Sequence, residues 1–94
     1  MKENMNLPTA REMIPTFMRV LEALGREANV RELEELVARE LGLTTDQLAL
    51  GHDVSRTEFQ YRLAWSRSYA KKQGLVVSPK RNRWSLAPGS PSSS

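Results

Sequence analysis

The chain of 94 residues has no cysteine and only one histidine. It can therefore form neither a disulfide nor a thiolate metal site, and His52 cannot hold a metal ion unless several carboxylates surround it. No apolar run approaches the roughly 20 residues of a membrane-spanning helix, and the first ten residues lack the apolar stretch of a secretion signal. These absences predict a cytoplasmic protein that uses no cofactor and does not insert into a membrane.

Acidic residues are scarce in the second half of the chain. Residues 1–53 contain six Lys and Arg against ten Asp and Glu, a balance of −4, whereas residues 54–94 contain eight against one, a balance of +7. A chain of this length forms one small domain, too small for a roomy active-site cleft with a lid. The asymmetry predicts one face suited to phosphate and an acidic back that discourages binding the wrong way round.

Residues 55–74 predict the helix around which the rest of the chain is organised. Ser55 and Glu58 have the spacing of a capping box, and Gly74 suits a left-handed C-terminal cap. Helical spacing predicts that one side packs on the core, with Phe59, Leu63, Trp65, Ser66, Tyr69 and Ala70. The opposite side is predicted to be a stripe without acidic residues, formed by Arg56, Gln60, Ala64, Arg67 and Lys71.

Such a stripe has what a helix in the major groove of DNA requires. Long basic side chains reach phosphates at the edges, and small or amide side chains stand where the backbone approaches base edges. A merely solvated basic face is the alternative interpretation, and the charge asymmetry favours the first. Arg62 falls within the apolar side, so it is predicted to be half-buried, stacked on an aromatic ring or paired with a Glu of another helix.

The segments before this helix predict a scaffold of shorter helices. Residues 9–24 have helical spacing and end at Gly25. Pro15 lies in the first turn and costs little if that helix begins near Arg11, but it predicts a kink if the helix begins at Thr9.

Residues 30–41 predict a second helix, and residues 44–50 predict a short third one that opens with a capping box. The glutamates of the second helix could bind a metal, but they lack a histidine partner and are interpreted as a solvated face: Glu32, Glu34, Glu35 and Glu40. His52 and Asp53 are neighbours in a loop without a supporting nucleophile, so a catalytic pair is disfavoured and His52 is predicted to approach a phosphate.

After Gly74 the pattern changes to that of a hairpin. Residues 75–77 predict one strand, residues 78–82 a turn and residues 83–86 the returning strand, with Trp84 anchoring it on the helices. The tip continues the basic face with Lys80, Arg81 and Arg83. The predicted fold is mainly helical with a small β-hairpin, a winged helix whose long basic helix is the recognition element.

The run RTEFQYRLAWSRSYAKKQGLVVSPKRNRWSL also resembles the N-terminal domain of Mrr-type modified-DNA restriction endonucleases, and the likeness extends over residues 7–87. Ser66, Ala70 and Asn82 depart from the family pattern, the last in place of a wing glycine. The matching positions are Arg56, Phe59, Tyr61, Arg62, Trp65, Arg67, Tyr69, Lys71, Lys72, Gly74, Leu75, Trp84 and Leu86. The resemblance implies a DNA-binding domain of a prokaryotic restriction system, without a counterpart here of the family's nuclease half.

Together these patterns predict a flexible segment 1–8, a domain 9–87 and a Ser/Pro tail or linker 88–94. The domain is predicted to bind double-stranded DNA without catalysis, as a stand-alone protein or as part of a longer enzyme with a C-terminal nuclease domain. A protein-interaction or dimerisation module of the same shape is the alternative. The predicted DNA contacts are Arg56, Thr57, Gln60, Ala64, Arg67, Lys71, Lys80, Arg81 and Arg83.

Overall fold

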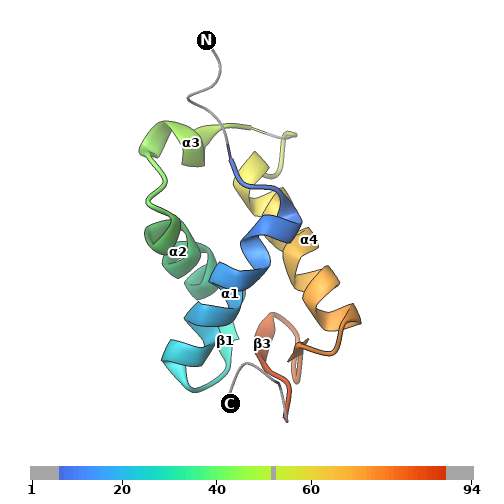
Figure 1. Cartoon of the computed structure of the whole chain (residues 1–94). Helices are drawn as coiled ribbons and strands as arrows, with labels where there is room; N and C mark the ends of the chain where they lie inside the picture. Colours follow the sequence, from blue (N-terminus) through green and yellow to red (C-terminus); the bar gives the residue numbers. More distant parts are fainter. Residues whose placement is uncertain (1–6, 52, 89–94) are drawn as a thin grey trace.

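The computed structural model describes residues 7–51 and 53–88 of the chain. The helices pack around a shared core with a small sheet at one end of the molecule (Figure 1). Along the chain the elements are α1 (Ala10–Leu24), β1 (Ala28–Asn29), α2 (Val30–Leu41), α3 (Thr45–Ala49), α4 (Glu58–Lys72), β2 (Val76–Val77) and β3 (Arg83–Leu86). This is the predicted winged helix, with α4 as its long basic helix and the segment β2 to β3 as its wing.

The first helix begins at the earlier of the two predicted positions. Thr9 caps α1, because its hydroxyl accepts from the Glu12 N–H at 3.2 Å and the Glu12 carboxylate accepts from the Thr9 N–H at 2.9 Å. Pro15 is therefore the sixth residue of α1 and lies beyond the first turn. Since proline has no N–H, the Arg11 carbonyl loses its usual helical donor.

The predicted start of α4 is wrong by two residues. Thr57 is the N-cap, and it forms a reciprocal capping box with Gln60 at 3.0 and 3.1 Å. Ser55 does not cap the helix, because its N–H and hydroxyl both donate to the Asp53 carboxylate. The capping box of Thr44 and Gln47 that opens α3 is confirmed.

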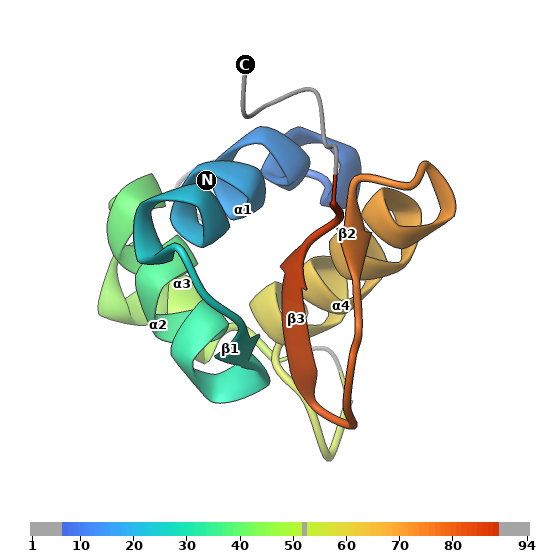
Figure 2. The same cartoon turned by 90° about the horizontal axis from the view of Figure 1, so that it is seen from below.

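The sheet contains a strand that the sequence pattern did not predict. Two-residue β1 pairs antiparallel with β3, placing Ala28 opposite Trp84, while β2 pairs with the other edge of β3, placing Val76 opposite Leu86. Figure 2 shows β3 between its two neighbours. At the wing turn, Asn82 has a φ of 60°. Asparagine tolerates this left-handed conformation, so it can replace the glycine of the family pattern.

The core lies between α1, α2 and α4. Its largest fully buried side chains include Met13, Phe17 and Leu21 from α1 and Leu33 and Val37 from α2. From α4 it receives Phe59, Leu63, Ser66 and Ala70.

Two α4 residues that were predicted to pack on the core behave differently from each other. Ser66 is fully buried and its hydroxyl donates to the Ala10 carbonyl at 2.8 Å, so its polar group is satisfied. Trp65, in contrast, is 46% exposed, which contradicts its predicted burial. The reason is that Trp65 lies at the edge of the predicted apolar side of the helix. The smaller side chains of Leu63 and Ser66 are fully buried and fill the contact with α1.

Candidate nucleic-acid interface

The buried residues of α4 define its other sides. Each residue turns an α-helix by about 100°, so positions two after a buried residue lie roughly opposite the core and positions one after it lie on a flank. Counting two positions on from the buried set Phe59, Leu63, Ser66 and Ala70 gives the outward residues Tyr61, Trp65, Ser68 and Lys72. Counting one position on gives Gln60, Ala64, Arg67 and Lys71.

The predicted basic stripe therefore lies on a flank of α4 and not opposite the core, which corrects the sequence interpretation. This flank faces α2 and the wing. The Gln60 amide donates to the Glu34 carboxylate of α2 at 3.4 Å, the Arg67 guanidinium lies 5.5 Å from the Trp84 ring centroid and the Lys71 ammonium lies 6.0 Å from it. Ala64 stands at the border between this flank and the outward side.

Arg67 is a predicted DNA-contact residue whose guanidinium is largely enclosed by the protein. Its Nε and Nη1 atoms are buried and have no hydrogen-bond partner among the described residues. Burial lowers the pKa of the guanidinium, and the negative charge of Glu34 partly opposes that shift. The contact with the Trp84 ring is a cation–π interaction, so Arg67 joins α4 to β3.

The other flank of α4 holds the segment before α1. Arg62 Nε donates to the Glu58 carboxylate at 2.7 Å, and its Nη1 donates to the Leu7 and Pro8 carbonyls at 2.8 and 3.2 Å. The half-burial predicted for Arg62 is confirmed, with its side chain 32% exposed. The predicted partner is wrong, because Glu58 belongs to the same helix and not to another.

The outward side of α4 carries a shallow hollow of about 230 Å³. Its lining residues are Arg56, Tyr61, Ala64, Trp65 and Ser68. Of these residues, Tyr61, Trp65 and Ser68 are not among the DNA contacts predicted from the sequence. Their signal was present, because an amphipathic helix exposes the positions offset by two from its buried ones.

The loop before α4 fixes the position of Arg56. The Asp53 carboxylate accepts from the N–H groups of Ser55 and Arg56, both at 2.9 Å, and from the Ser55 hydroxyl at 3.1 Å. The hydrogen bond from the Ser55 N–H is the main reason that the pKa of Asp53 is lowered. The Arg56 guanidinium lies 4.0 Å from Asp53 and 5.4 Å from the centroid of the Tyr61 ring. His52, predicted to approach a phosphate, lies outside the described residues.

The wing turn presents the remaining predicted cations. Lys80 and Arg81 are exposed, and neither forms an ion pair within residues 7–51 and 53–88. Arg83 instead pairs with Glu27 at 3.8 Å, next to its strand partner β1. The Ser78 hydroxyl lies 3.0 Å from the Lys80 carbonyl and 2.9 Å from the Arg83 carbonyl. A hydrogen bond from this hydroxyl to the backbone therefore stabilises the turn.

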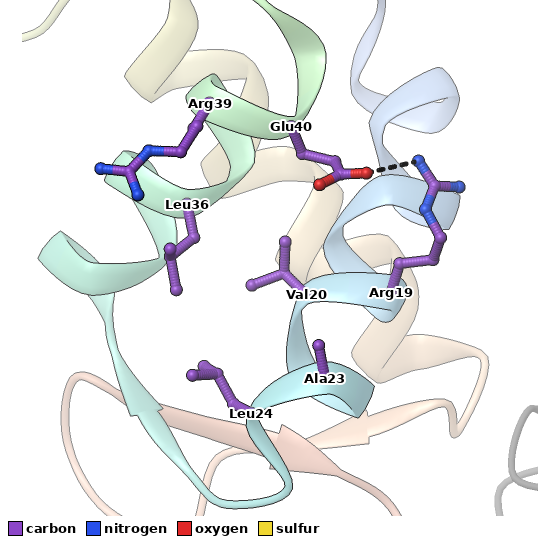
Figure 3. Close-up of a pocket in the computed structure, with 7 residues that line it drawn as sticks. All are labelled: Arg19, Val20, Ala23, Leu24, Leu36, Arg39 and Glu40. Atoms are coloured by element: carbon purple, nitrogen blue, oxygen red, sulfur yellow. Dashed lines mark ion pairs between the residues drawn. The ribbon is translucent and has the colours of Figure 1, made fainter.

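A second hollow, of about 330 Å³, lies between α1 and α2 (Figure 3). Val20, Leu24 and Leu36 line its apolar floor, and the Arg19–Glu40 ion pair of 3.7 Å stands at its edge. None of the residues that line it comes from α4 or the wing.

The described part of the chain contains neither a candidate metal site nor a candidate membrane span. No group of three or more His, Cys, Asp or Glu side chains is placed to hold a metal ion among residues 7–51 and 53–88. None of the helices formed there combines the length and apolar character needed to traverse a lipid bilayer.

Comparison with known proteins gives a match over most of the chain. The family model described as the Mrr N-terminal domain matches residues 11–89. The type IV methyl-directed restriction enzyme EcoKMrr of Escherichia coli (strain K12) is 30% identical over 84 residues, which are 89% of this chain and 28% of that enzyme. The chain thus spans little more than a quarter of the length of this relative. No solved structure matches the chain.

Proposed function

The chain belongs to the family of the Mrr N-terminal domain, and from this premise we propose that it binds double-stranded DNA and is not itself catalytic. In the proposed complex α4 enters the major groove. The wing then reaches the flanking phosphates or the adjacent minor groove. The fold supports this docking, since α4 and the wing lie side by side, with Arg67 of α4 against the Trp84 ring of β3.

One observation carries the proposal: four cations, two in the last turn of α4 and two in the wing turn, are exposed and not neutralised. Lys71, Lys72, Lys80 and Arg81 form no ion pair with any residue that the structure describes. Glu58 is the sole acidic residue after Asp53 in the sequence, and it is turned toward Arg62 on the far flank. Exposed cations grouped around an outward helix face are what a polyanion requires.

Seven of the nine predicted contacts divide into two groups in this arrangement. Arg56, Lys71, Lys80 and Arg81 contact phosphates, while Thr57, Ala64 and Gln60 lie nearest to base edges. Gln60 must first exchange its hydrogen bond with Glu34, which at 3.4 Å is long. The two remaining predicted contacts interact with the wing or belong to it. Arg67 contacts the Trp84 ring, and Arg83 forms an ion pair with Glu27.

A salt titration tests the proposal. If the four cations assigned to phosphate contacts and the exposed Lys72 neutralise phosphates, the logarithm of the binding constant falls against the logarithm of the salt concentration with a slope of about −4 to −5. Fluorescence anisotropy with a labelled duplex at ~50 and ~200 mM salt should therefore show a loss of affinity of roughly 250- to 1,000-fold. A slope near zero, or no binding at either salt concentration, contradicts the proposal.

Two matched arginine variants test the orientation. Arg81→Ala should weaken binding to all sequences alike and reduce the slope by about 0.9, because one phosphate contact is lost. Arg39→Ala removes the same charge from the exposed side of α2, beside the α1–α2 hollow, and should leave the slope unchanged. An equal effect of both substitutions would mean that only net charge matters.

We further propose that the domain recognises the DNA target of a restriction endonuclease, with a C-terminal nuclease domain as its covalent partner. The support is the match to a methyl-directed restriction enzyme. Titrating methylated and unmethylated copies of one duplex tests this. Equal affinity for both would leave DNA binding in place and remove methylation sensing by this domain.

The second candidate, a protein-interaction or dimerisation module, is favoured by the apolar hollow between α1 and α2. Self-association there is expected to persist at high salt, since apolar burial is not screened. Sedimentation of the wild type and of Leu36→Asp at ~500 mM salt distinguishes the two functions, because only the interaction module predicts dissociation by this substitution.

A further inference from the structure

We propose that the hollow on the outward side of α4 reads the C5-methyl group of a pyrimidine in the major groove. Arg56, Tyr61, Ala64, Trp65 and Ser68 line this hollow. The inference rests on the proposed function, since it assumes that α4 faces base edges. It goes further by assigning base reading to the outward side of α4, beyond the base-edge contacts proposed for Thr57, Gln60 and Ala64.

The position of the hollow is the first argument. Tyr61, Trp65 and Ser68 each stand two residues after a buried residue of α4, so they project away from the core. The flank residues are already engaged, Gln60 with Glu34 and Arg67 with Trp84. When α4 enters a groove, the outward side meets the base edges first and the flanks meet the walls.

The apolar character of the hollow is the second argument. Trp65 is 46% exposed on a helix whose other large apolar residues are buried, and its ring packs at 5.7 Å from the Tyr69 ring centroid. Trp65 lines one hollow together with Tyr61 and Ala64, and a contiguous apolar surface of this kind next to cations indicates a binding surface. Ala64 contributes only a methyl group to the floor, so a ligand can approach the helix backbone closely.

The chemistry of the lining residues selects the ligand. In the major groove the C5-methyl of a pyrimidine is the apolar group on a base edge, and it is contacted by small or aromatic apolar side chains. Ala64, Tyr61 and Trp65 provide such surfaces. The Ser68 hydroxyl can donate to or accept from a neighbouring base edge. Of the lining residues only Arg56 carries a guanidinium, and it lies over the Tyr61 ring near Asp53.

Thymine and 5-methylcytosine both carry this methyl group, and the experiment separates them. Three duplex pools of ~30 base pairs are copied from one random template: one with thymine, one with deoxyuracil in place of every thymine, and one with thymine and 5-methylcytosine. Competition anisotropy at fixed salt measures their relative affinities for the full chain. Deoxyuracil removes the methyl group and leaves the base-pairing groups and phosphate charge unchanged.

The wild type is expected to bind the deoxyuracil pool about three- to fourfold more weakly for each methyl group in contact, the factor for burying one such group. A gain for the 5-methylcytosine pool assigns the contact to that base as well; no gain assigns it to thymine alone. Ala64→Leu fills the hollow with a residue of good helix propensity and should abolish the preference for thymine over deoxyuracil. Arg81→Ala is the control, and should weaken all pools alike while keeping their ratios.

Failure of the inference is distinguishable from failure of the proposed function. Salt-sensitive binding with equal affinity for the thymine and deoxyuracil pools overturns methyl reading and leaves DNA binding intact. Loss of self-association in Trp65→Ala, with pool ratios unchanged, assigns the aromatic surface to a protein contact and also overturns the inference. No binding to any pool refutes both proposals together.

Discussion

Removing the Arg62 side chain should destabilise the fold, because this half-buried side chain joins α4 to the segment before α1. Its guanidinium makes three hydrogen bonds, to the Glu58 carboxylate at 2.7 Å and to the Leu7 and Pro8 carbonyls at 2.8 and 3.2 Å. Arg62→Ala removes all three and leaves Glu58 without this partner. It also frees the segment before α1, which Arg62 holds against α4.

The expected loss can be estimated from these contacts. A hydrogen bond that involves a charged group contributes about 1.5–3 kcal/mol when it is protected from water. The Arg62 side chain is 32% exposed, so water can replace part of each contact and the sum is not additive. We therefore expect a loss of about 2 kcal/mol in the free energy of unfolding. For a domain of this size that corresponds to a fall in Tm of roughly 8–16 °C.

Urea unfolding followed by circular dichroism measures this loss. The midpoint should fall while the m-value is unchanged, because the surface exposed on unfolding stays the same. Arg62→Lys keeps the charge but loses the forked geometry, and should recover only part of the stability. Arg39→Ala removes an exposed arginine from α2 and serves as the control. A loss below about 0.5 kcal/mol in the free energy of unfolding for Arg62→Ala would refute this stabilising role, since substitutions of exposed residues give values of that size.

Three further predictions concern α4 and the segments that it meets. Thr57→Ala should destabilise the domain by about 1 kcal/mol in urea unfolding, because the N-cap of α4 is lost. Ser55→Ala should destabilise it less, and the reverse order would indicate that Ser55 is the N-cap. Because the pKa of Asp53 is lowered in the fold, its stabilising contribution is complete above its ordinary pKa of about 3.9 and is lost as pH falls through the lower folded value. Asp53→Asn should flatten that acid-side fall in thermal melts, and an unchanged pH profile would show that the turn does not depend on the charge. In a double-mutant cycle, Arg67→Ala and Trp84→Ala should couple by about 0.5–1 kcal/mol, and strict additivity would count against the cation–π contact.

The helices could be predicted from the sequence because their signals are local. Residues 30–41 form α2 as predicted, since the apolar spacing is regular and Gly42, with a φ of 68°, ends the helix. Trp84 anchors the wing as expected, because an aromatic residue in an isolated hairpin needs a surface to cover. The helix depends on residues within a few positions of one another, whereas the partners of Trp84 are distant in sequence and only its need for a covering surface was predictable.

The features that escaped prediction depend on distant partners. Strand β1 consists of Ala28 and Asn29, neither of which favours a strand, and it exists because β3 pairs with it. The orientation of Arg67 likewise depends on where the wing folds back, which helical spacing within α4 does not determine. For the candidate site, the residue types and the charge were therefore predictable, whereas the division of α4 into outward and flanking sides required the packed structure.

The central place of β3 in the sheet has a consequence for the order in which the domain is made. In the described structure β1 and β2 do not pair with each other, and each pairs with β3. Ala28 therefore has no strand partner until Trp84 has been synthesised. On the ribosome α1, α2, α3 and α4 emerge before Arg83–Leu86 does. The sheet therefore closes last, and ribosome-bound chains stalled before residue 83 should hold helical structure while the position of the wing relative to α4 is still unset.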